Sequence, residues 1–330
     1  MTMPFQTIQR KRVIVMAPTL LPWSETFIRE QVLAMQQWQP ILVGERIAPD
    51  GLPIDQLPHQ VFCPSTANIV RRLAYAISSR LGFTDPISLR ALRRLDASIV
   101  HVHFGTAAVD YWPLLRHLQI PIVITLHGFD INVHRQWWEA GHGGPRRRSY
   151  PTKLLRLAHQ PGVSFIAVSE SIRDCALAFG IPPERIVVRH IGVNTDAFRP
   201  LVARTTDRPR RALFVARLVE KKGAKYLLEA FQRVAPHLPD AELLIGGTGP
   251  EEAELRTLAG QSTSAIRFLG KLSSQEVCEH LRHSRVFCCP SVTASNGDDL
   301  RTNFVSNQAV SSAGMISGWD QFRRMVAGGL

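Results

Sequence analysis

The feature that most constrains the fold is a repeated alternation of short apolar runs with segments whose apolar residues follow helical spacing. The runs have the length and composition of buried strands, and the segments between them predict helices. Strands are expected at 13–17, 40–44, 97–103, 120–127, 164–169, 185–192, 212–217, 241–246, 265–270 and 285–290. Helices are expected at 25–35, 69–81, 107–118, 170–179, 224–235, 251–258 and 274–283. This alternation is typical of α/β proteins with parallel sheets.

The chain is long for a single core, since its 330 residues exceed the usual size of one domain. A polar, proline-containing stretch at 201–211 (LVARTTDRPRR) predicts a linker. We therefore expect a Rossmann-like domain over 1–200, a second one over 212–298, and a ligand in the cleft that the two domains face. Residues 299–330 form an atypical tail.

Several classes of protein are disfavoured by what the sequence lacks. It has no run of 18 uncharged apolar residues, and its first residues lack the apolar core of a signal peptide, which favours a cytoplasmic protein. Five cysteines, an odd number without CxxC or Cys/His spacing, indicate neither a disulfide framework nor a zinc site. His101 and His103 point to one face of their strand, but no third ligand follows nearby to favour a metal site.

The formal net charge of +12 is concentrated in clusters of arginine. The clusters are Arg71 and Arg72; Arg90, Arg93 and Arg94; and Arg146, Arg147 and Arg148 with Lys153 and Arg156. They could contact anionic lipid headgroups, nucleic acid or phosphorylated substrates, or simply be solvated. No zinc finger or aromatic-interleaved basic strip accompanies them, so nucleic acid is not expected as a partner.

Residues 212–231 (ALFVARLVEKKGAKYLLEAF) carry the strongest functional signal. An apolar strand is followed by Arg217, Lys221 and Lys222, then by Gly223 in a tight turn, then by an amphipathic helix. The free N–H groups and the positive end of that helix would meet the cations, which together favour a diphosphate. The alternative is an ordinary basic turn on the surface.

Other predicted strands also deliver polar residues at their carboxyl ends. Ser24 can act as an N-cap with Glu25 in the first helical turn, which is the pattern of a plain helix start, although a loop here would also face the cleft. His127, Gly128 and Asp130 follow another strand, where the imidazole could bind a ligand or be structural. The glycines of GTGP, which include Gly249, form neither a GxGxxG fingerprint nor a P-loop. A nicotinamide dehydrogenase and an NTPase are therefore not indicated.

Taken together, these segments resemble the family-4 retaining glycosyltransferases of the GT-B fold, over roughly residues 10–298. The motifs that carry the resemblance are SETFIREQ, HVHFG, THGFDI, AVSESIRD, HIGVNTDAF, FVARLVEKKGAKYLLEAF, LLIGGTGPEEAEL, IRFLGKLSSQEV and VFCCPSVTASNGD. In style they are most similar to members that assemble exopolysaccharides such as colanic acid.

The resemblance implies a donor site for a nucleoside-diphosphate sugar, and a glycan or lipid-linked acceptor. Arg217 and Lys222 would hold the diphosphate without a metal or other cofactor, and His127 would contact the transferred sugar. The donor-binding positions would be Gly128, Asp130, Gly223, Gly249, Phe268, Leu269 and Leu272, the last three flanking a UDP or GDP base. The loop around Ser24 and Glu25 would close over the phosphates or the acceptor.

The sequence departs from the family after Asp298. Family members continue with a Glu-x7-Glu pair, and ungapped counting puts Leu300 and Gln308 at those positions. We hypothesise that residues from about 299 onward are a frameshifted or prematurely ended tail, which would leave the second domain incomplete and impair the enzyme. Two alternative functions are a non-catalytic protein that binds nucleotides or sugar phosphates, and a basic protein that binds a surface.

Overall fold

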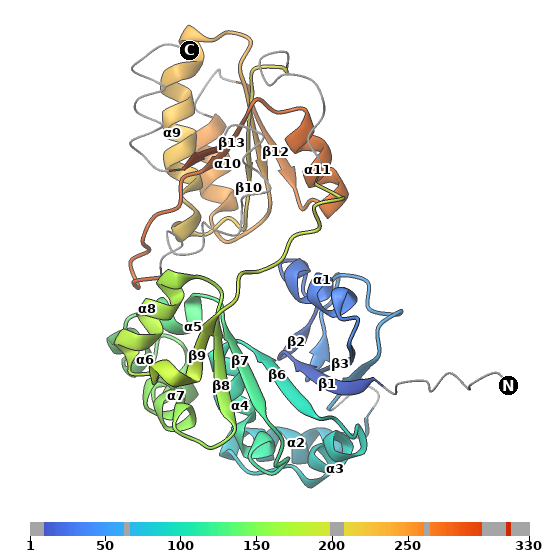
Figure 1. The fold of residues 1–330 in the computed structure, drawn as a ribbon. Helices are drawn as coiled ribbons and strands as arrows, with labels where there is room; N and C mark the ends of the chain where they lie inside the picture. The colour runs from blue at the N-terminus through green and yellow to red at the C-terminus, as the bar shows by residue number, and fades with distance from the viewer. Residues whose placement is uncertain (1–9, 63–66, 199–207, 261–264, 299–314, 318–330) are drawn as a thin grey trace, which may run out of the picture. The chain divides into compact units, whose positions relative to one another are not determined.

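The structure is a computed structural model of the chain, and it describes residues 10–62, 67–198, 208–260, 265–298 and 315–317. The chain divides into two compact units, residues 1–192 and 193–330 (Figure 1). Each unit is described by itself below.

The first unit is built on a seven-stranded parallel sheet with the strand order β5-β3-β1-β6-β7-β8-β9. Its strands are β1 (Lys11–Met16), β3 (Trp38–Gly44), β5 (His59–Val61), β6 (Ile99–His103), β7 (Ile122–Leu126), β8 (Val163–Ala167) and β9 (Ile186–Val188). A short parallel pair, β2 (Thr19–Leu20) and β4 (Arg46–Ile47), lies outside this sheet. Because all the strands run in one direction, their carboxyl ends lie along one edge of the sheet.

Helices connect these strands and complete two hydrophobic layers. They are α1 (Thr26–Ala34), α2 (Ile69–Leu81), α3 (Pro86–Arg94), α4 (Gly105–Leu115), α5 (Phe129–Asn132), α6 (Arg135–Glu139), α7 (Tyr150–Ala158) and α8 (Glu170–Phe179). Alternate residues of β1 pack into different layers: Ile14 and Met16 join one core cluster, and Val13 and Val15 join another. This alternation is the signature of a strand buried on both faces.

The second unit has a five-stranded parallel sheet with the order β12-β11-β10-β13-β14. Its elements are β10 (Arg211–Val215), α9 (Ala224–Val234), β11 (Glu242–Gly246), α10 (Glu252–Gly260), β12 (Ala265–Gly270), α11 (Ser274–Arg282), β13 (Val286–Cys289) and β14 (Met315–Ser317). Phe214, Leu243 and Ile245 pack on the face covered by α9 and α10, while Leu213 and Leu244 pack on the other face.

The predicted strands are all present, but some boundaries were wrong. The strand predicted at 185–192 ends at Val188, after which the chain leaves the sheet and His190 Nδ1 lies 3.2 Å from the carbonyl oxygen of Val168. Two nine-residue helices, α3 and α7, were not predicted. Strand β14 falls in the tail that we expected to be atypical and pairs in parallel with β13. Residues 299–314 and 318–330, including Leu300 and Gln308, lie outside the described residues.

Candidate functional site

Asp130 organises the turn that follows β7 in the first unit. Its carboxylate is fully buried; Oδ1 accepts hydrogen bonds from the backbone N–H groups of His127 (3.0 Å) and Gly128 (2.9 Å). Oδ2 accepts a third, at 2.8 Å, from the N–H of Gly105 at the start of α4. Gly128 has φ 129° and ψ −73°, a conformation that a side chain would disfavour. Asp130 thus fixes the backbone that presents His127.

His127 belongs to a group of three imidazoles at the carboxyl ends of β6 and β7. Its Nε2 lies 3.0 Å from Nδ1 of His103, and the His103 ring lies 4.5 Å, centroid to centroid, from the ring of His101. His101 in turn makes a 2.7 Å contact with the hydroxyl of Thr125. Burial lowers the pKa of His101 to about 4 and that of His127 to about 3, and it lowers the pKa of His103 well below its usual value. The three rings are therefore neutral at physiological pH and can donate and accept hydrogen bonds.

Two aromatic side chains contact the His127 ring. Phe27 from α1 and Phe104 at the end of β6 lie 4.8 and 4.7 Å from it, centroid to centroid. Phe104 has φ 73°, a backbone strain that a non-glycine residue rarely carries. Strain held at a strand end beside a polar ring is a common mark of a functional site.

The loop before α1 places Glu25 as the N-cap residue, so the prediction that Ser24 caps the helix was wrong. Ser24 is exposed, and the Glu25 side chain makes no capping hydrogen bond. Instead Glu25 is largely buried, its Oε2 has no hydrogen-bond partner among the described residues, and burial raises its pKa to about 7. A carboxyl group with that pKa can exchange a proton near neutral pH.

In the second unit, the loop after β10 is held by backbone contacts with neighbouring loops. The N–H groups of Ala216 and Leu218 donate to the carbonyls of Gly246 (3.1 Å) and Thr248 (3.0 Å). The N–H of Val292 donates to the carbonyl of Lys221 (3.0 Å). These hydrogen bonds join the loops after β10, β11 and β13 at the carboxyl edge of the sheet.

Glycine is required where these loops meet. A β-carbon on Gly223 would collide with the carbonyl oxygen of Pro290, and one on Gly249 would collide with that of Leu218. Gly223 also has φ 68° and is the N-cap residue of α9. The close packing brings the N-terminus of α9, whose first N–H groups have no intrahelical partner, beside the two lysines.

Lys221 and Lys222 differ in their surroundings. Lys221 Nζ forms a 2.7 Å ion pair with Oδ2 of the buried Asp298. Lys222 is partly buried, and burial together with the charge of Lys221 lowers its pKa. No carboxylate within the described ranges forms an ion pair with Lys222 or with the exposed Arg217. The loop therefore holds two cations that an anion could neutralise.

Two of the three side chains predicted to flank a base, Phe268 and Leu269, lie on opposite faces of the sheet. Phe268 packs with the α9 and α10 layer, where the Arg256 guanidinium lies 4.6 Å from its ring centroid. Leu269 belongs to the opposite layer, as its neighbouring position on a strand requires. Leu272 follows β12 and lies close to Gly246.

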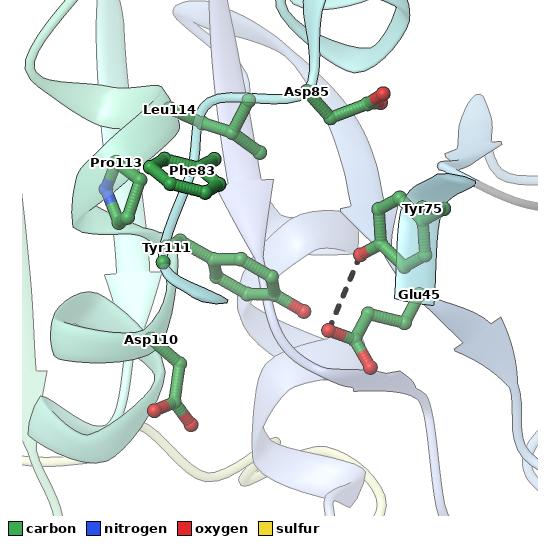
Figure 2. A pocket seen from close by; sticks show the side chains of 9 residues that line it. Glu45, Tyr75, Phe83, Asp85, Asp110, Tyr111, Pro113 and Leu114 are labelled. Atoms are coloured by element: carbon green, nitrogen blue, oxygen red, sulfur yellow. Dashed lines mark hydrogen bonds between the residues drawn. The ribbon is translucent and has the colours of Figure 1, made fainter. Parts of the chain in front are cut away.

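A small pocket lies elsewhere in the first unit, between α2 and α4 (Figure 2). The Tyr75 hydroxyl donates a 3.2 Å hydrogen bond to Glu45 there, and burial raises the pKa of that carboxyl. The Tyr111 hydroxyl is buried without a hydrogen-bond partner among the described residues. None of these three residues was predicted to form a site.

Several contacts of the candidate site were not predicted. The ion pair between Lys221 and Asp298 joins residues 77 positions apart in the sequence, and no local sequence pattern predicts it. Phe27 and Phe104 appeared only as apolar members of motifs. The position of His103 did have a sequence signal, because His103 alternates with Val102 and points to the same face of the strand as His101. We interpreted that pattern only as a candidate metal site. The described residues contain no group of histidine, cysteine and acidic side chains arranged to hold a metal ion.

Known proteins match both units. The family described as Glycosyltransferase Family 4 matches residues 49–197, and the family described as Glycosyl transferases group 1 matches residues 209–310. The amylovoran biosynthesis glycosyltransferase AmsK of Erwinia amylovora is 31% identical over 61% of this chain and 48% of its own length. A phosphatidyl-myo-inositol mannosyltransferase of Mycolicibacterium smegmatis is 32% identical over 71% of this chain and 57% of its own. The chain thus spans about half the length of these curated relatives.

Solved structures share the fold at low sequence identity. Anabaena Alr3699/HepE, crystallised with UDP and glucose, aligns with a TM-score of 0.63 and 14% identity over 87% of this chain and 76% of its own. WaaG, a glycosyltransferase involved in lipopolysaccharide biosynthesis, aligns with a TM-score of 0.60 and 14% identity over 92% of this chain and 79% of its own. These alignments agree with two Rossmann-like sheets of the GT-B fold.

Proposed function

Because the chain carries a Glycosyltransferase Family 4 domain followed by a Glycosyl transferases group 1 domain on a GT-B fold, we propose that it is a glycosyltransferase of polysaccharide or glycolipid biosynthesis. It would move a sugar from a nucleoside diphosphate to a glycan or lipid-linked acceptor, with retention of configuration. The names of its relatives, which include amylovoran biosynthesis and phosphatidyl-myo-inositol mannosylation, support this class of acceptor.

The observation that carries the proposal is the pair of cations in the segment between β10 and α9: Arg217 follows the strand, and Lys222 precedes the helix. Lys222 is partly desolvated, and like Arg217 it has no ion-pair partner among the described carboxylates. A diphosphate would neutralise both and accept hydrogen bonds from the helix end. During transfer the same groups would stabilise the negative charge that grows on the leaving diphosphate, so the proposed reaction needs no metal.

The first unit would supply groups for the transferred sugar and the acceptor. A neutral His127, held by Asp130 and the Gly128 turn, can hydrogen-bond a sugar hydroxyl. Glu25, with its raised pKa, is suited to exchange a proton with an acceptor hydroxyl near neutral pH. Of the base-flanking candidates, Leu272 lies beside Gly246 at the end of β11, where a β-carbon added to that glycine would collide with it.

Binding of the donor diphosphate is tested by thermal shift. UDP or GDP is expected to raise the melting temperature, and Arg217→Ala or Lys222→Ala to abolish the rise. Arg233→Ala is a matched control, since Arg233 is exposed in the last turn of α9, at the opposite end of that helix from Lys222. No shift with either nucleotide would contradict the proposal.

A second candidate function is nucleotide or sugar-phosphate binding without turnover. Its motive is that ungapped counting within the resemblance puts Leu300 and Gln308 at the positions of the family's two glutamates. Transfer of label from UDP-, GDP- or ADP-sugars separates the two functions, because a non-catalytic protein would show the thermal shift but no transfer. Resequencing the gene tests the related hypothesis that residues after Asp298 result from a frameshift.

We also propose that the protein works on the inner face of a membrane, where lipid-linked acceptors lie. The arginine clusters of the first unit support contact with anionic lipid. None of the described helices is both long enough and apolar enough to span a bilayer.

A further inference from the structure

The pocket between α2 and α4 is lined by acidic and aromatic side chains that take no part in the proposed transfer reaction (Figure 2). Three carboxylates line it, those of Glu45, Asp85 and Asp110, together with the side chains of Tyr75 and Tyr111. Its inner space has a volume of about 20 Å³, which holds one water-sized group. The pocket therefore admits the end of a small ligand, and the groups around the inner space decide which chemistry that end must have.

Two of the three carboxylates already have an arginine partner. Asp85 pairs with Arg71 at 2.7 Å, and Asp110 pairs with Arg147 at 3.1 Å. Glu45 forms no ion pair within the part of the chain that the structure describes. The pocket thus contains one carboxylate that still lacks a countercharge in direct contact.

The surroundings of Glu45 disfavour its ionised form. Burial raises the pKa of this carboxyl, although the hydrogen bond from Tyr75 and the more distant charges of Arg46 and Arg146 act in the opposite direction. The Arg46 guanidinium is engaged elsewhere, since its Nε donates a 3.1 Å hydrogen bond to the hydroxyl of Thr19. A cation placed in the pocket beside Glu45 would favour the ionised carboxylate.

The Tyr111 hydroxyl points toward the same space. Tyr111 is only 3% exposed, and its hydroxyl oxygen has no hydrogen-bond partner among the described residues. Figure 2 shows this hydroxyl directed toward the Glu45 carboxyl. A buried polar group without a partner costs stability, so its presence calls for an explanation. A group seated between these two side chains must donate to the carboxylate, and it can also donate to the phenolic oxygen.

The remaining wall of the pocket is apolar. Phe83, Pro113 and Leu114 also line it, and Figure 2 shows them on the side opposite Glu45. Phe83 is 66% exposed, so this wall is open to a ligand that enters from solvent. The wall suits a short hydrocarbon chain, while the aromatic rings of the pocket attract a cation.

We propose that this pocket binds a small molecule that carries a primary ammonium group on a short apolar chain. The ammonium group would donate hydrogen bonds to Glu45 and Tyr111, and the chain would lie against Phe83 and Leu114. An ammonium group is compact and has three donors, so it fits the space of a water molecule and also supplies the positive charge that water lacks. The inference goes beyond the proposed transfer reaction and uses none of the residues proposed for it.

Thermal shift at constant ionic strength tests the binding. We expect n-butylammonium chloride to raise the melting temperature of the full chain with a Kd of about 1 mM, as suits so small a ligand. 1-Butanol, which has the same chain without the charge, is expected not to raise it. Glu45→Gln is expected to weaken amine binding by at least about tenfold, and Tyr111→Phe by about fivefold.

Matched substitutions outside the pocket serve as controls. Glu30→Gln, 44% exposed on α1, and Tyr226→Phe, 47% exposed on α9, are expected to bind the amine as the unsubstituted chain does. Tyr111→Phe removes only a hydroxyl that lacks a partner, so this variant is expected to fold, and its weaker binding would not reflect a loss of structure.

A crystal structure of the full chain with n-butylammonium is expected to show the nitrogen between Glu45 and Tyr111. Three results would overturn the proposal: an equal thermal shift with 1-butanol, amine binding that both pocket substitutions leave unchanged, or an ordered water alone at this position in crystals that contain the amine. The test uses no nucleotide, so a failure of the UDP- or GDP-dependent shift bears only on the donor site.

Discussion

Lys221 Nζ lies 2.7 Å from Oδ2 of Asp298, and this ion pair connects the loop after β10 to the loop after β13. Lys222, the next residue, has no such ion pair within the described residues. A second contact stabilises the connection between the two loops, because the N–H and the hydroxyl of Ser295 both donate hydrogen bonds to the Glu220 carboxylate, at 3.0 and 2.9 Å. The carboxylate of Asp298 thus neutralises one lysine of the pair. Lys222 is the cation that the proposed diphosphate would neutralise.

The first prediction concerns the ion pair between Lys221 and Asp298. Asp298→Asn leaves Lys221 partly buried without a countercharge, and we expect it to destabilise the second unit by about 3 kcal/mol. Lys221→Met in the same chain should restore much of the loss, since it removes the unpaired charge. Hydrogen exchange of peptides from residues 208–298 measures both effects. If Lys221→Met made no difference in the Asp298→Asn background, the two side chains would not be coupled.

The second prediction concerns the glycine contacts beside the proposed diphosphate site. Gly249→Ala would force the β-carbon into the Leu218 carbonyl and displace the loop, so we expect a loss of at least about 2 kcal/mol of stability and of the UDP-dependent thermal shift. Gly260→Ala, at the end of α10, has open space around the added methyl group and is expected to be neutral or slightly stabilising. Equal effects of the two substitutions would contradict this account.

The sequence was sufficient to predict the strands and most helices, because apolar runs and helical spacing record which residues are buried. It was also sufficient to place Arg217 and His127 just after strands, and Lys222 in the turn before a helix. It could not predict that Lys221 pairs with Asp298, which depends on how two distant loops meet. It also could not predict that the apolar side chains of α2 are exposed, because periodicity identifies an apolar face of a helix but not whether the protein covers that face.

The third prediction follows from the raised pKa of Glu25. A carboxyl group whose pKa rises from 4.5 to about 7 on folding favours the folded state when protonated, so its contribution is fully present below pH 4.5 and is lost as the pH rises through about 7. Glu25→Gln removes the buried charge. We expect this variant to be more stable than the unsubstituted chain at pH 8, by at most about 3 kcal/mol, with the difference vanishing below about pH 4.5.

Tryptophan fluorescence during urea unfolding suits this measurement, because five of the six tryptophans lie in the first unit. Glu30→Gln is a matched control on the same helix, since Glu30 is 44% exposed. A stability difference independent of pH would show that the ionised form of Glu25 is not penalised by burial.

The fourth prediction concerns the buried imidazoles. Burial lowers the pKa of His101 from 6.5 to about 4, so the folded state disfavours its proton, and stability present above pH 6.5 is lost as the pH falls toward 4. The pKa values of His103 and His127 are lowered too, and each of these residues adds up to about 1.4 kcal/mol per pH unit to the slope of the unfolding free energy against pH.

His101→Gln keeps a polar group near the Thr125 hydroxyl but cannot take up a proton. We therefore expect urea unfolding of the first unit to show a shallower loss of stability between pH 6.5 and 4 in this variant, by about 1.4 kcal/mol per pH unit, whereas His159→Gln, at an exposed position, should leave the slope unchanged. An unchanged slope in His101→Gln would mean that this ring takes up a proton as readily in the folded as in the unfolded chain.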